Sequence, residues 1–150
     1  MKIVILGCGR VGSALATLMS RENHEVRIID RDGDAFRRLG SDYAGMRVVG
    51  IGIDEDVLRR AGIHDADAFV SVTNGDNTNI MAAQIAKERF GVPTVIARIY
   101  DPIRAEAYSK MGIKTYCSTV IGAGILEDLV TGQPVKSYEE YAKLTGELGR

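Results

Sequence analysis

Residues 2–12 have the sequence KIVILGCGRVG and predict a buried strand, a glycine loop and the first turn of a helix. Residues 3–6 form an unbroken apolar run, which is typical of a strand covered on both faces in a parallel sheet. Gly7, Gly9 and Gly12 follow with the spacing G-x-G-x-x-G. The first glycine of this motif permits a tight turn, the second lets a pyrophosphate approach the backbone, and the third lets helix pack on strand. The free N–H groups and partial positive charge of the helix N-terminus favour phosphate binding.

The sequence after the glycine loop meets two further requirements of a dinucleotide-binding unit. Residues 13–19 are small and apolar on helical spacing, so the loop opens a helix. Residues 25–29 predict a second strand that ends at Asp30, at the spacing from the loop that the motif requires. A carboxylate there can accept hydrogen bonds from both ribose hydroxyls of an adenosine. We therefore interpret the motif as a nucleotide site rather than as a turn without a ligand.

Strand and helix patterns alternate along the rest of the chain. The further strands that we expect are residues 47–51, 66–72, 92–97 and 114–117. The further helices that we expect are residues 34–39, 54–61, 78–90, 101–111 and 120–130. This alternation predicts an α/β, Rossmann-like fold, with a doubly wound open sheet of about six mostly parallel strands and helices on both faces. We expect residues 1–132 to form one nucleotide-binding domain, and residues 133–150 to form a tail or short helix with no second domain.

The ligand of a doubly wound sheet binds outside the carboxyl ends of the strands, where the strand order reverses. Besides the glycine loop, the polar turns that we expect at this edge are residues 30–31, 50–53, 73–76 and 98–101. His24 precedes the second strand and so belongs to the opposite end of the sheet, and His64 follows a helix. Both histidines are expected to be surface residues rather than catalytic ones.

The sequence shows none of the common catalytic motifs. Hydride transfer needs a substrate pocket and usually an acid or base beside the nicotinamide. No G-K-[ST] follows the glycine loop, and the sequence shows no nucleophile elbow, metal-ligand cluster or paired catalytic carboxylates. We therefore expect a nucleotide-binding domain that is not an enzyme and holds no metal. The alternative is an NAD-dependent oxidoreductase cofactor domain that is separated from its substrate domain.

Composition bounds the partners and the location that we expect. Hydrophobic residues make up 45% of the chain and charged residues 26%, as in ordinary globular proteins. The net charge of −1 does not provide the basic surface that nucleic acid requires. No apolar run approaches the roughly 20 residues of a membrane helix, and no signal peptide is recognisable, so we expect a cytoplasmic protein. Cys8 and Cys117 lack metal-ligand spacing, and Cys8 is interpreted as a small loop residue.

Several motifs together resemble the TrkA-N domains, also called KTN domains or RCK N-lobes, that regulate bacterial potassium channels and transporters. The matching stretches are residues 7–12 (GCGRVG), 26–30, 58–63 (LRRAGI), 67–70, 73–79 (TNGDNTN), 97–98 and 111–113. The arginine inside the glycine loop and the T-N-x-D-x-x-N segment are the specific parts of the resemblance, which covers about residues 1–132.

The resemblance implies a cytosolic, ligand-sensing regulatory subunit that binds NAD(H), ATP, ADP or AMP. Such domains pair into homodimers and larger rings that dock on a separate, membrane-embedded potassium channel or transporter subunit. The chain would then be cytoplasmic and peripheral to the inner membrane through its partner. The smaller C-terminal ligand lobe of many family members has no counterpart among these 150 residues.

The resemblance also implies roles for residues around the first two strands. The N–H groups of residues 9–11 hold phosphate, and Arg10 adds a cation, either to its own nucleotide or across a dimer interface. Asp30 takes the ribose. Arg31 lies beside the adenosine or is solvated.

Further roles concern the fourth and fifth strands. The resemblance places Thr73 and Asn74 under the phosphates or the distal ribose. Arg98 is a second candidate cation, or it pairs with Asp101. Asn79 is expected to cap or stabilise its loop rather than to touch the ligand.

The chain departs from the family pattern in two places. The family commonly has Gly-Asp-Ala after the third strand, whereas residues 50–52 here are GIG. Recognition of the base is therefore expected to be apolar or backbone-mediated, at Ile51. Some ATP-binding members carry an acid after the sixth strand that helps to hold a divalent ion, whereas residues 118–120 here are STV. Both departures weaken the case for a metal–ATP site.

The expected nucleotide-binding residues are Gly7, Cys8, Gly9, Arg10, Val11, Gly12, Asp30, Arg31, Ile51, Thr73, Asn74 and Arg98. The apolar helix at residues 120–130 is expected to act as a hinge or dimer interface, because Gly122 and Gly124 permit close backbone contact.

Overall fold

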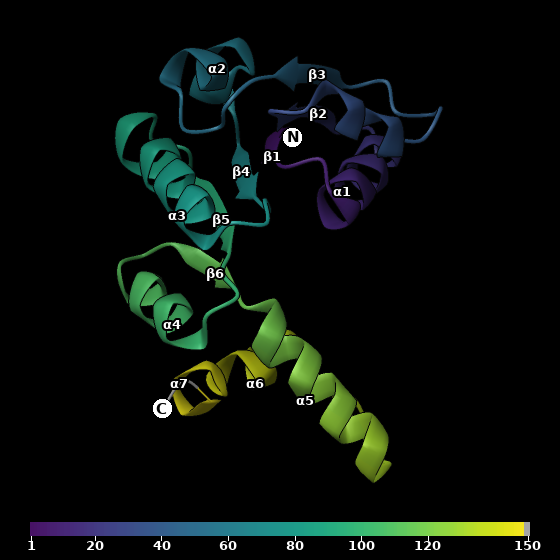
Figure 1. The fold of residues 1–150 in the computed structure, drawn as a ribbon, viewed down its shortest axis with the longest axis vertical. Helices are drawn as coiled ribbons and strands as arrows, with labels where there is room; N and C mark the ends of the chain where they lie inside the picture. Colours follow the sequence, from purple (N-terminus) through teal and green to yellow (C-terminus); the bar gives the residue numbers. More distant parts are fainter. Residues whose placement is uncertain (149–150) are drawn as a thin grey trace.

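The sheet has the strand order β3-β2-β1-β4-β5-β6, and all neighbouring strands are parallel. The computed structural model describes residues 1–148 (Figure 1). The strands are β1 (Lys2–Leu6), β2 (Glu25–Asp30), β3 (Met46–Val49), β4 (Ala68–Ser71), β5 (Thr94–Arg98) and β6 (Lys114–Tyr116). The order reverses between β1 and β4, so the carboxyl ends of these two strands flank the switch point. The predicted Rossmann-like fold is thereby confirmed.

Helices cover both faces of the sheet (Figure 1). They are α1 (Arg10–Arg21), α2 (Glu55–Arg60), α3 (Asp76–Gln84), α4 (Pro102–Lys110), α5 (Ser118–Thr131), α6 (Tyr138–Lys143) and α7 (Thr145–Leu148). Short helices of other types are η1 (Gly33–Arg38) and η2 (Ile63–Asp65), which are 3-10 helices, and η3 (Ile85–Arg89), a π-helix. Helix α1 and η1 pack on one face, and α2, α3 and α4 pack on the other.

The apolar run in β1 is continuous because both of its faces are covered. Ile3 and Ile5 pack in the same core cluster as Ala16 of α1. Val4 and Leu6 point to the opposite face and pack in the cluster that contains Leu58 of α2. Successive side chains of a strand alternate between faces, so a strand with two covered faces needs apolar residues at every position.

Element boundaries differ from the predicted ones by a few residues. The third strand ends at Val49, so Ile51 lies in the following turn. The helix predicted to begin at residue 78 begins at Asp76, because Gly75 takes the extended N-cap conformation. The segment expected to be an ordinary helix at residues 34–39 is the 3-10 helix η1, in which the Asp34 N–H donates to the side chain of the N-cap residue Asp32.

The C-terminal tail is helical and is anchored by Tyr141. This side chain is buried, and its hydroxyl donates to the Asp128 carboxylate of α5 at 2.7 Å. The Lys136 ammonium donates to the same carboxylate at 2.7 Å. A Cβ on Gly124 would lie 2.5 Å from the Tyr141 ring, so this glycine is used within the chain. Gly122 and Gly124 were expected to permit close contact at a hinge or dimer interface, and the group that approaches Gly124 is the Tyr141 ring of the same chain.

Within residues 1–148, none of the helices is both long enough and apolar enough to cross a bilayer.

Candidate functional site

Three glycines shape the loop between β1 and α1, each for a different reason. Gly7 has φ +104°, and a Cβ there would lie 2.9 Å from the backbone nitrogen of Thr73. A Cβ on Gly12 would lie 1.8 Å from the carbonyl oxygen of Gly7, so only glycine lets α1 pack this closely on β1. A Cβ on Gly9 would meet nothing within 4 Å. Gly9 therefore leaves open space in front of the loop, where a phosphate could approach the backbone.

The N-terminus of α1 presents unpaired donors to this space. Gly9 is the N-cap, and no side chain caps the helix there. Ser13 N–H donates to the carbonyl oxygen of Gly9 at 2.9 Å, which closes the first helical turn. The N–H groups of Arg10, Val11 and Gly12 precede that bond and have no partner within the helix. They point outward together with the positive end of the helix dipole, as an anion site requires.

The carboxylate of Asp30 is held at the end of β2, next to the glycine loop. One oxygen accepts the Cys8 N–H at 2.7 Å, and the other accepts the Asp32 N–H at 2.9 Å. Each carboxylate oxygen can accept a second hydrogen bond, so the group is oriented but not saturated. The following residue, Arg31, is exposed. Asp30 thus lies where a ribose beside the loop would need an acceptor.

The side chain of Cys8 points away from the expected site. The thiol is buried and lies 3.4 Å from the carbonyl oxygen of Ala35, to which it donates. Burial, together with the nearby Asp30 carboxylate, raises the pKa of the Cys8 thiol to about 11. Cys8 therefore contributes its backbone N–H to the site, and its sulfur remains a protonated packing group at neutral pH.

The turn after β3, which contains Ile51, exposes apolar side chains. The N–H of Gly50 donates to the carbonyl oxygen of Asp30 at 2.9 Å, which brings the turn after β3 beside the end of β2. Val49, Ile51 and Ile53 are large hydrophobic residues that remain exposed at this turn. They form an apolar surface next to the Asp30 carboxylate, as expected for a base contacted without polar side chains.

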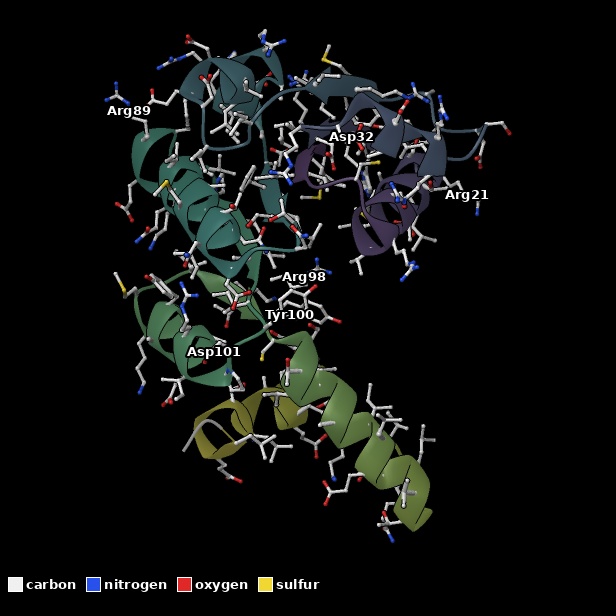
Figure 2. The ribbon with its side chains drawn as sticks, viewed as in Figure 1. Arg21, Asp32, Arg89, Arg98, Tyr100 and Asp101 are labelled. Carbon is white, nitrogen blue, oxygen red and sulfur yellow. The ribbon has the colours of Figure 1, made fainter. Side chains whose placement is uncertain are left out.

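Arg98 is the last residue of β5, and its guanidinium reaches the end of β4. Its Nη2 donates to the carbonyl oxygens of Val72 at 2.7 Å and Thr73 at 2.9 Å. The same group stacks over the Tyr100 ring at 4.9 Å (Figure 2). The alternative in which Arg98 pairs with Asp101 was wrong, since Asp101 caps α4 by accepting the N–H groups of Ile103 and Arg104.

One atom of Arg98 is left without a protein partner. Among the described residues, its Nε is the buried side-chain nitrogen that forms no hydrogen bond. Buried donors are normally paired, and an unpaired one in a native fold calls for an explanation. An anionic ligand or an ordered water at this edge would supply the acceptor, which is consistent with the predicted cation role.

Side chains from α3 tie the loop after β4 to the loop after β5. Asn79 bridges Thr73 and the carbonyl oxygen of Arg98, which confirms the prediction that Asn79 stabilises its loop. Asp76 accepts the N–H groups of Tyr100 at 2.9 Å and Asp101 at 3.1 Å. No role was predicted for Asp76. Its position as the first residue of α3, directly after the loop that follows β4, is the sequence feature that could have indicated one.

The edge residues form two groups. The glycine loop, Asp30 and the Ile51 turn adjoin one another around β1, β2 and β3. Thr73 and Arg98 contact each other at the ends of β4 and β5, and Gly7 touches Thr73 where the two groups meet. The side chains of Arg10, Arg31 and Asn74 are exposed and form no hydrogen bond or ion pair within residues 1–148.

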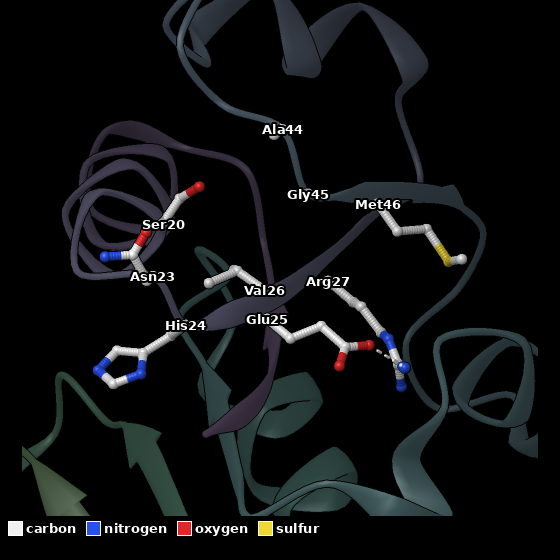
Figure 3. Close-up of a pocket in the computed structure, with 9 residues that line it drawn as sticks. All are labelled: Ser20, Asn23, His24, Glu25, Val26, Arg27, Ala44, Gly45 and Met46. Carbon is white, nitrogen blue, oxygen red and sulfur yellow. Dashed lines mark hydrogen bonds and ion pairs between the residues drawn. The ribbon is translucent and has the colours of Figure 1, made fainter.

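A hollow lies at the opposite end of the sheet from the glycine loop (Figure 3). Its volume is about 410 Å³, and residues from the amino-terminal ends of β2 and β3 line it, including His24, Glu25, Arg27 and Met46. Glu25 and Arg27 form an ion pair within it. Because ligands of doubly wound sheets bind at the carboxyl ends, this hollow is not part of the nucleotide site.

The fold and this edge define a class of protein. A parallel sheet with a glycine loop at its switch point, a dipole-aligned helix N-terminus and a carboxylate after the second strand is a Rossmann-like domain of the nucleotide-binding type.

Sequence comparison then identifies the family. The family model of the TrkA-N domain matches residues 3–119. The chain is 60% identical over 115 residues to the Trk system potassium uptake protein TrkA of Streptomyces coelicolor, covering 77% of this chain and 52% of that protein. It is 34% identical over 132 residues to the TrkA homolog of Methanothermobacter thermautotrophicus, covering 87% and 61%. The chain belongs to the TrkA-N domain family and spans about half the length of the Streptomyces relative.

Solved structures agree with this family. The GsuK channel bound to NAD superposes with a TM-score of 0.73 at 26% identity, covering 95% of this chain and 24% of that one. The TrkA-N domain of the inner membrane protein ybaL from Escherichia coli superposes with a TM-score of 0.76 at 16% identity, covering 86% and 96%. At 16% identity, the second match supports the fold alone.

Proposed function

We propose that this chain is a nucleotide-sensing regulatory domain of a potassium uptake channel or transporter. The observation that carries the proposal is an open glycine loop paired with an oriented carboxylate at the end of the next strand. Gly9 leaves space in front of the unpaired N–H groups of α1, and Asp30 is held beside it by the Cys8 N–H. This arrangement suits a phosphate group next to a ribose, as in NAD(H), AMP, ADP and ATP.

Different residues of the carboxyl edge contact different parts of the nucleotide. The N–H groups at the start of α1 hold phosphate, and Arg10 and Arg98 add positive charge. Asp30 accepts the ribose hydroxyls, while Ile51 and its exposed neighbours offer the base an apolar surface. The bound nucleotide supplies charge and shape to this site. No residue of the edge is assigned a catalytic role, so the proposed function is regulatory rather than enzymatic.

Regulation requires a second surface that responds to the ligand. Helix α5 extends away from the sheet beyond β6 (Figure 1). Leu126, Leu129 and Val130 on this helix are 62%, 61% and 86% exposed. We propose that this apolar face pairs with a second copy of the chain, giving a homodimer or a larger ring at the cytoplasmic side of the inner membrane. A nucleotide would bias a membrane-embedded partner only by binding two assembly states with different affinity.

The relatives support this proposal without deciding the ligand. The proteins that match at 60% and 34% identity are named as potassium uptake proteins. Solved structures at 26% identity include the GsuK channel bound to NAD and GsuK bound to ADP. These names describe those proteins, and we extend them to this chain because its loop and carboxylate geometry suits the same class of ligand.

The proposal is tested by thermal shifts with NADH, NAD, ATP, ADP and AMP. A ligand that binds only the folded state stabilises by RT ln(1 + [L]/Kd), which is about 2.7 kcal/mol at a concentration of 100 Kd. We expect at least one nucleotide to raise the melting temperature, and the Asp30→Ala variant to lose most of that increase. If none of the five nucleotides shifts melting, the binding proposal is wrong.

The alternative, an oxidoreductase cofactor domain, makes a different prediction. It requires the protein to transfer a hydride between NAD(H) and a small substrate. Absorbance at the NADH band, followed in the presence of candidate alcohols, aldehydes and 2-hydroxy acids, measures this directly. Turnover of NADH would contradict the regulatory proposal, whereas binding without turnover supports it.

A further inference from the structure

The side chain of Asn79 is fully buried near the start of α3, between the ends of β4 and β5. Its Oδ1 accepts hydrogen bonds from the Thr73 N–H at 2.9 Å and the Thr73 hydroxyl at 2.8 Å. Its Nδ2 donates to the carbonyl oxygens of Thr73 and Arg98, both at 2.9 Å. A side-chain amide has two donor hydrogens and two acceptor lone pairs. Every hydrogen-bonding position of Asn79 is therefore used.

These four bonds converge on backbone that the phosphate loop touches. A Cβ on Gly7 would lie 2.9 Å from the Thr73 nitrogen and 3.1 Å from the Val72 oxygen, so the two segments are in direct contact. The Arg98 guanidinium also donates to the carbonyl oxygens of Val72 and Thr73. Asn79 thus immobilises the short segment against which both the glycine loop and a candidate cation rest.

The ribose and base side of the edge does not depend on this amide. Asp30 is oriented by the N–H groups of Cys8 and Asp32, and the Ile51 turn is joined to β2 through Gly50. These contacts lie on the other side of β1 from β4 and β5. Loss of the Asn79 bonds should therefore disturb Thr73, Arg98 and the glycine loop that rests on them. It should leave Asp30 and the Ile51 turn in place.

We infer that Asn79 is a positioning residue, which sets the geometry of Thr73, Arg98 and the glycine loop toward phosphate without touching the ligand. The inference rests on the proposed nucleotide binding. An ordinary core residue would stabilise the fold and would change the affinity for all ligands of the site alike. A positioning residue changes the additional affinity that phosphates give over adenosine alone.

The test compares the affinities for adenosine and ADP by isothermal titration calorimetry. We expect Asn79→Ala to weaken ADP binding about tenfold, the effect of losing one or two well-placed hydrogen bonds, and to leave adenosine binding within about twofold. Ile80→Ala is the matched control, because Ile80 is the buried neighbour of Asn79 in α3 and packs in the core. This variant should lower the melting temperature but keep the ratio of the two affinities.

Asn79→Ser provides a milder variant, because its hydroxyl can restore one bond, and it should fall between wild type and Asn79→Ala. A measurement on the wild-type protein covers the case in which neither variant folds. ADP should slow hydrogen exchange at the Asn79 side-chain amide and the Thr73 N–H more than adenosine does.

The outcomes separate the inference from the proposed function. If the wild-type protein binds neither ADP nor adenosine, the proposed function fails and the inference fails with it. If wild type binds ADP more tightly than adenosine but Asn79→Ala changes both affinities equally, the inference alone is overturned. Equal slowing of exchange by the two ligands would also overturn it.

Discussion

The two halves of the carboxyl edge are built in different ways. The half around β1 and β2 comes from one continuous stretch, residues 7–30, and it works mainly through backbone. Gly9 supplies open space, α1 supplies N–H groups, and the Cys8 N–H orients Asp30. The half around β4 and β5 comes from separate segments, and it works through side chains. Asn79 and Arg98 reach across from different elements, and both donate to the carbonyl oxygen of Thr73.

The two halves should therefore be disrupted by different kinds of substitution. A backbone site is insensitive to most side-chain changes, but it fails when a Cβ enters the space that glycine leaves. A side-chain network tolerates nearby changes in volume, but it fails when one buried partner is lost and the others are left unpaired. Five predictions test this contrast, beginning with the largest expected effect.

Replacing two glycines of the loop should separate binding from folding. In Gly9→Ala the new methyl group stands between phosphate and three N–H groups, each worth about 1 kcal/mol, so affinity should fall about 100-fold. Its melting temperature should stay within about 2 °C, because the Cβ meets nothing. In Gly12→Ala the overlap with the Gly7 oxygen should cost about 3 kcal/mol and lower the melting temperature by about 10 °C.

Titration calorimetry and thermal melts measure both quantities. A Gly9→Ala protein that binds as wild type does would show that phosphate does not approach this part of the loop. A Gly12→Ala protein with normal stability would contradict the close packing of α1 on β1.

Cys8 should be unreactive although it sits in the binding loop. Because burial raises its pKa to about 11, the thiolate fraction at pH 8 is about 100-fold smaller than for an ordinary thiol. Alkylation by iodoacetamide should be slower by about that factor, and the rate should rise with pH up to about 11. Mass spectrometry of a Cys117→Ser protein isolates the reaction of Cys8, and fast alkylation at pH 7 would mean that the sulfur is not held in the core.

Asp30→Ala should weaken nucleotide binding about 30-fold, since a hydrogen bond to a charged group is worth about 2 kcal/mol. The expected loss is similar for ADP and adenosine, because both carry the ribose. Asp32→Ala is the matched control, since the Asp32 side chain caps η1 and the variant keeps the Asp32 N–H that orients Asp30. Equal effects of the two substitutions would argue against a ribose contact at Asp30.

The two candidate cations, Arg98 and Arg10, should contribute differently to the affinity for ADP. Arg98→Gln should reduce the affinity for ADP about tenfold, since the guanidinium is partly buried and held by two carbonyl groups. Arg10→Gln should reduce it only about threefold, as expected for an exposed ion pair. Raising the salt concentration should weaken the Arg10 contribution more than that of Arg98. A larger effect at Arg10 would indicate that it is buried when the ligand binds or when the chain assembles.

Arg10 also offers a way to separate binding from regulation. Its side chain projects from the loop without a partner in residues 1–148. If it acts across an interface between copies, Arg10→Gln should change the assembly state with nucleotide while leaving the affinity nearly unchanged. Analytical ultracentrifugation with and without ADP measures this.

Much of the fold and half of the site could be predicted from sequence because their signals are local. The apolar run of β1, the spacing of Gly7, Gly9 and Gly12, and the acid at Asp30 all lie within one βαβ unit. Each reflects a steric or electrostatic requirement of neighbouring residues, so spacing along the chain is sufficient to recognise it. The alternation of strands and helices then specified the doubly wound sheet, through the preference for right-handed crossovers.

Other features could not be predicted, because they depend on contacts between distant segments. Arg98 could pair with Asp101 or remain free on sequence grounds, and only the packing of β5 beside β4 brings it to the carbonyl groups of Val72 and Thr73. Gly122 and Gly124 were expected to permit close contact at a hinge or dimer interface, and only the return of the tail places Tyr141 on Gly124. The spacing of residues along the chain does not indicate which distant segments pack against each other.

The residue types at positions 7–12 and at Asp30 are enough to predict a glycine loop at the switch point, on the carboxyl edge of a parallel sheet, because they satisfy local steric rules wherever they occur. The tertiary structure alone decided how the other half of that edge is held. Asn79, Thr73 and Arg98 are joined by hydrogen bonds between β4, α3 and β5. A buried amide finds its partners only when these elements pack, because each partner lies on a segment that sequence order does not place beside it.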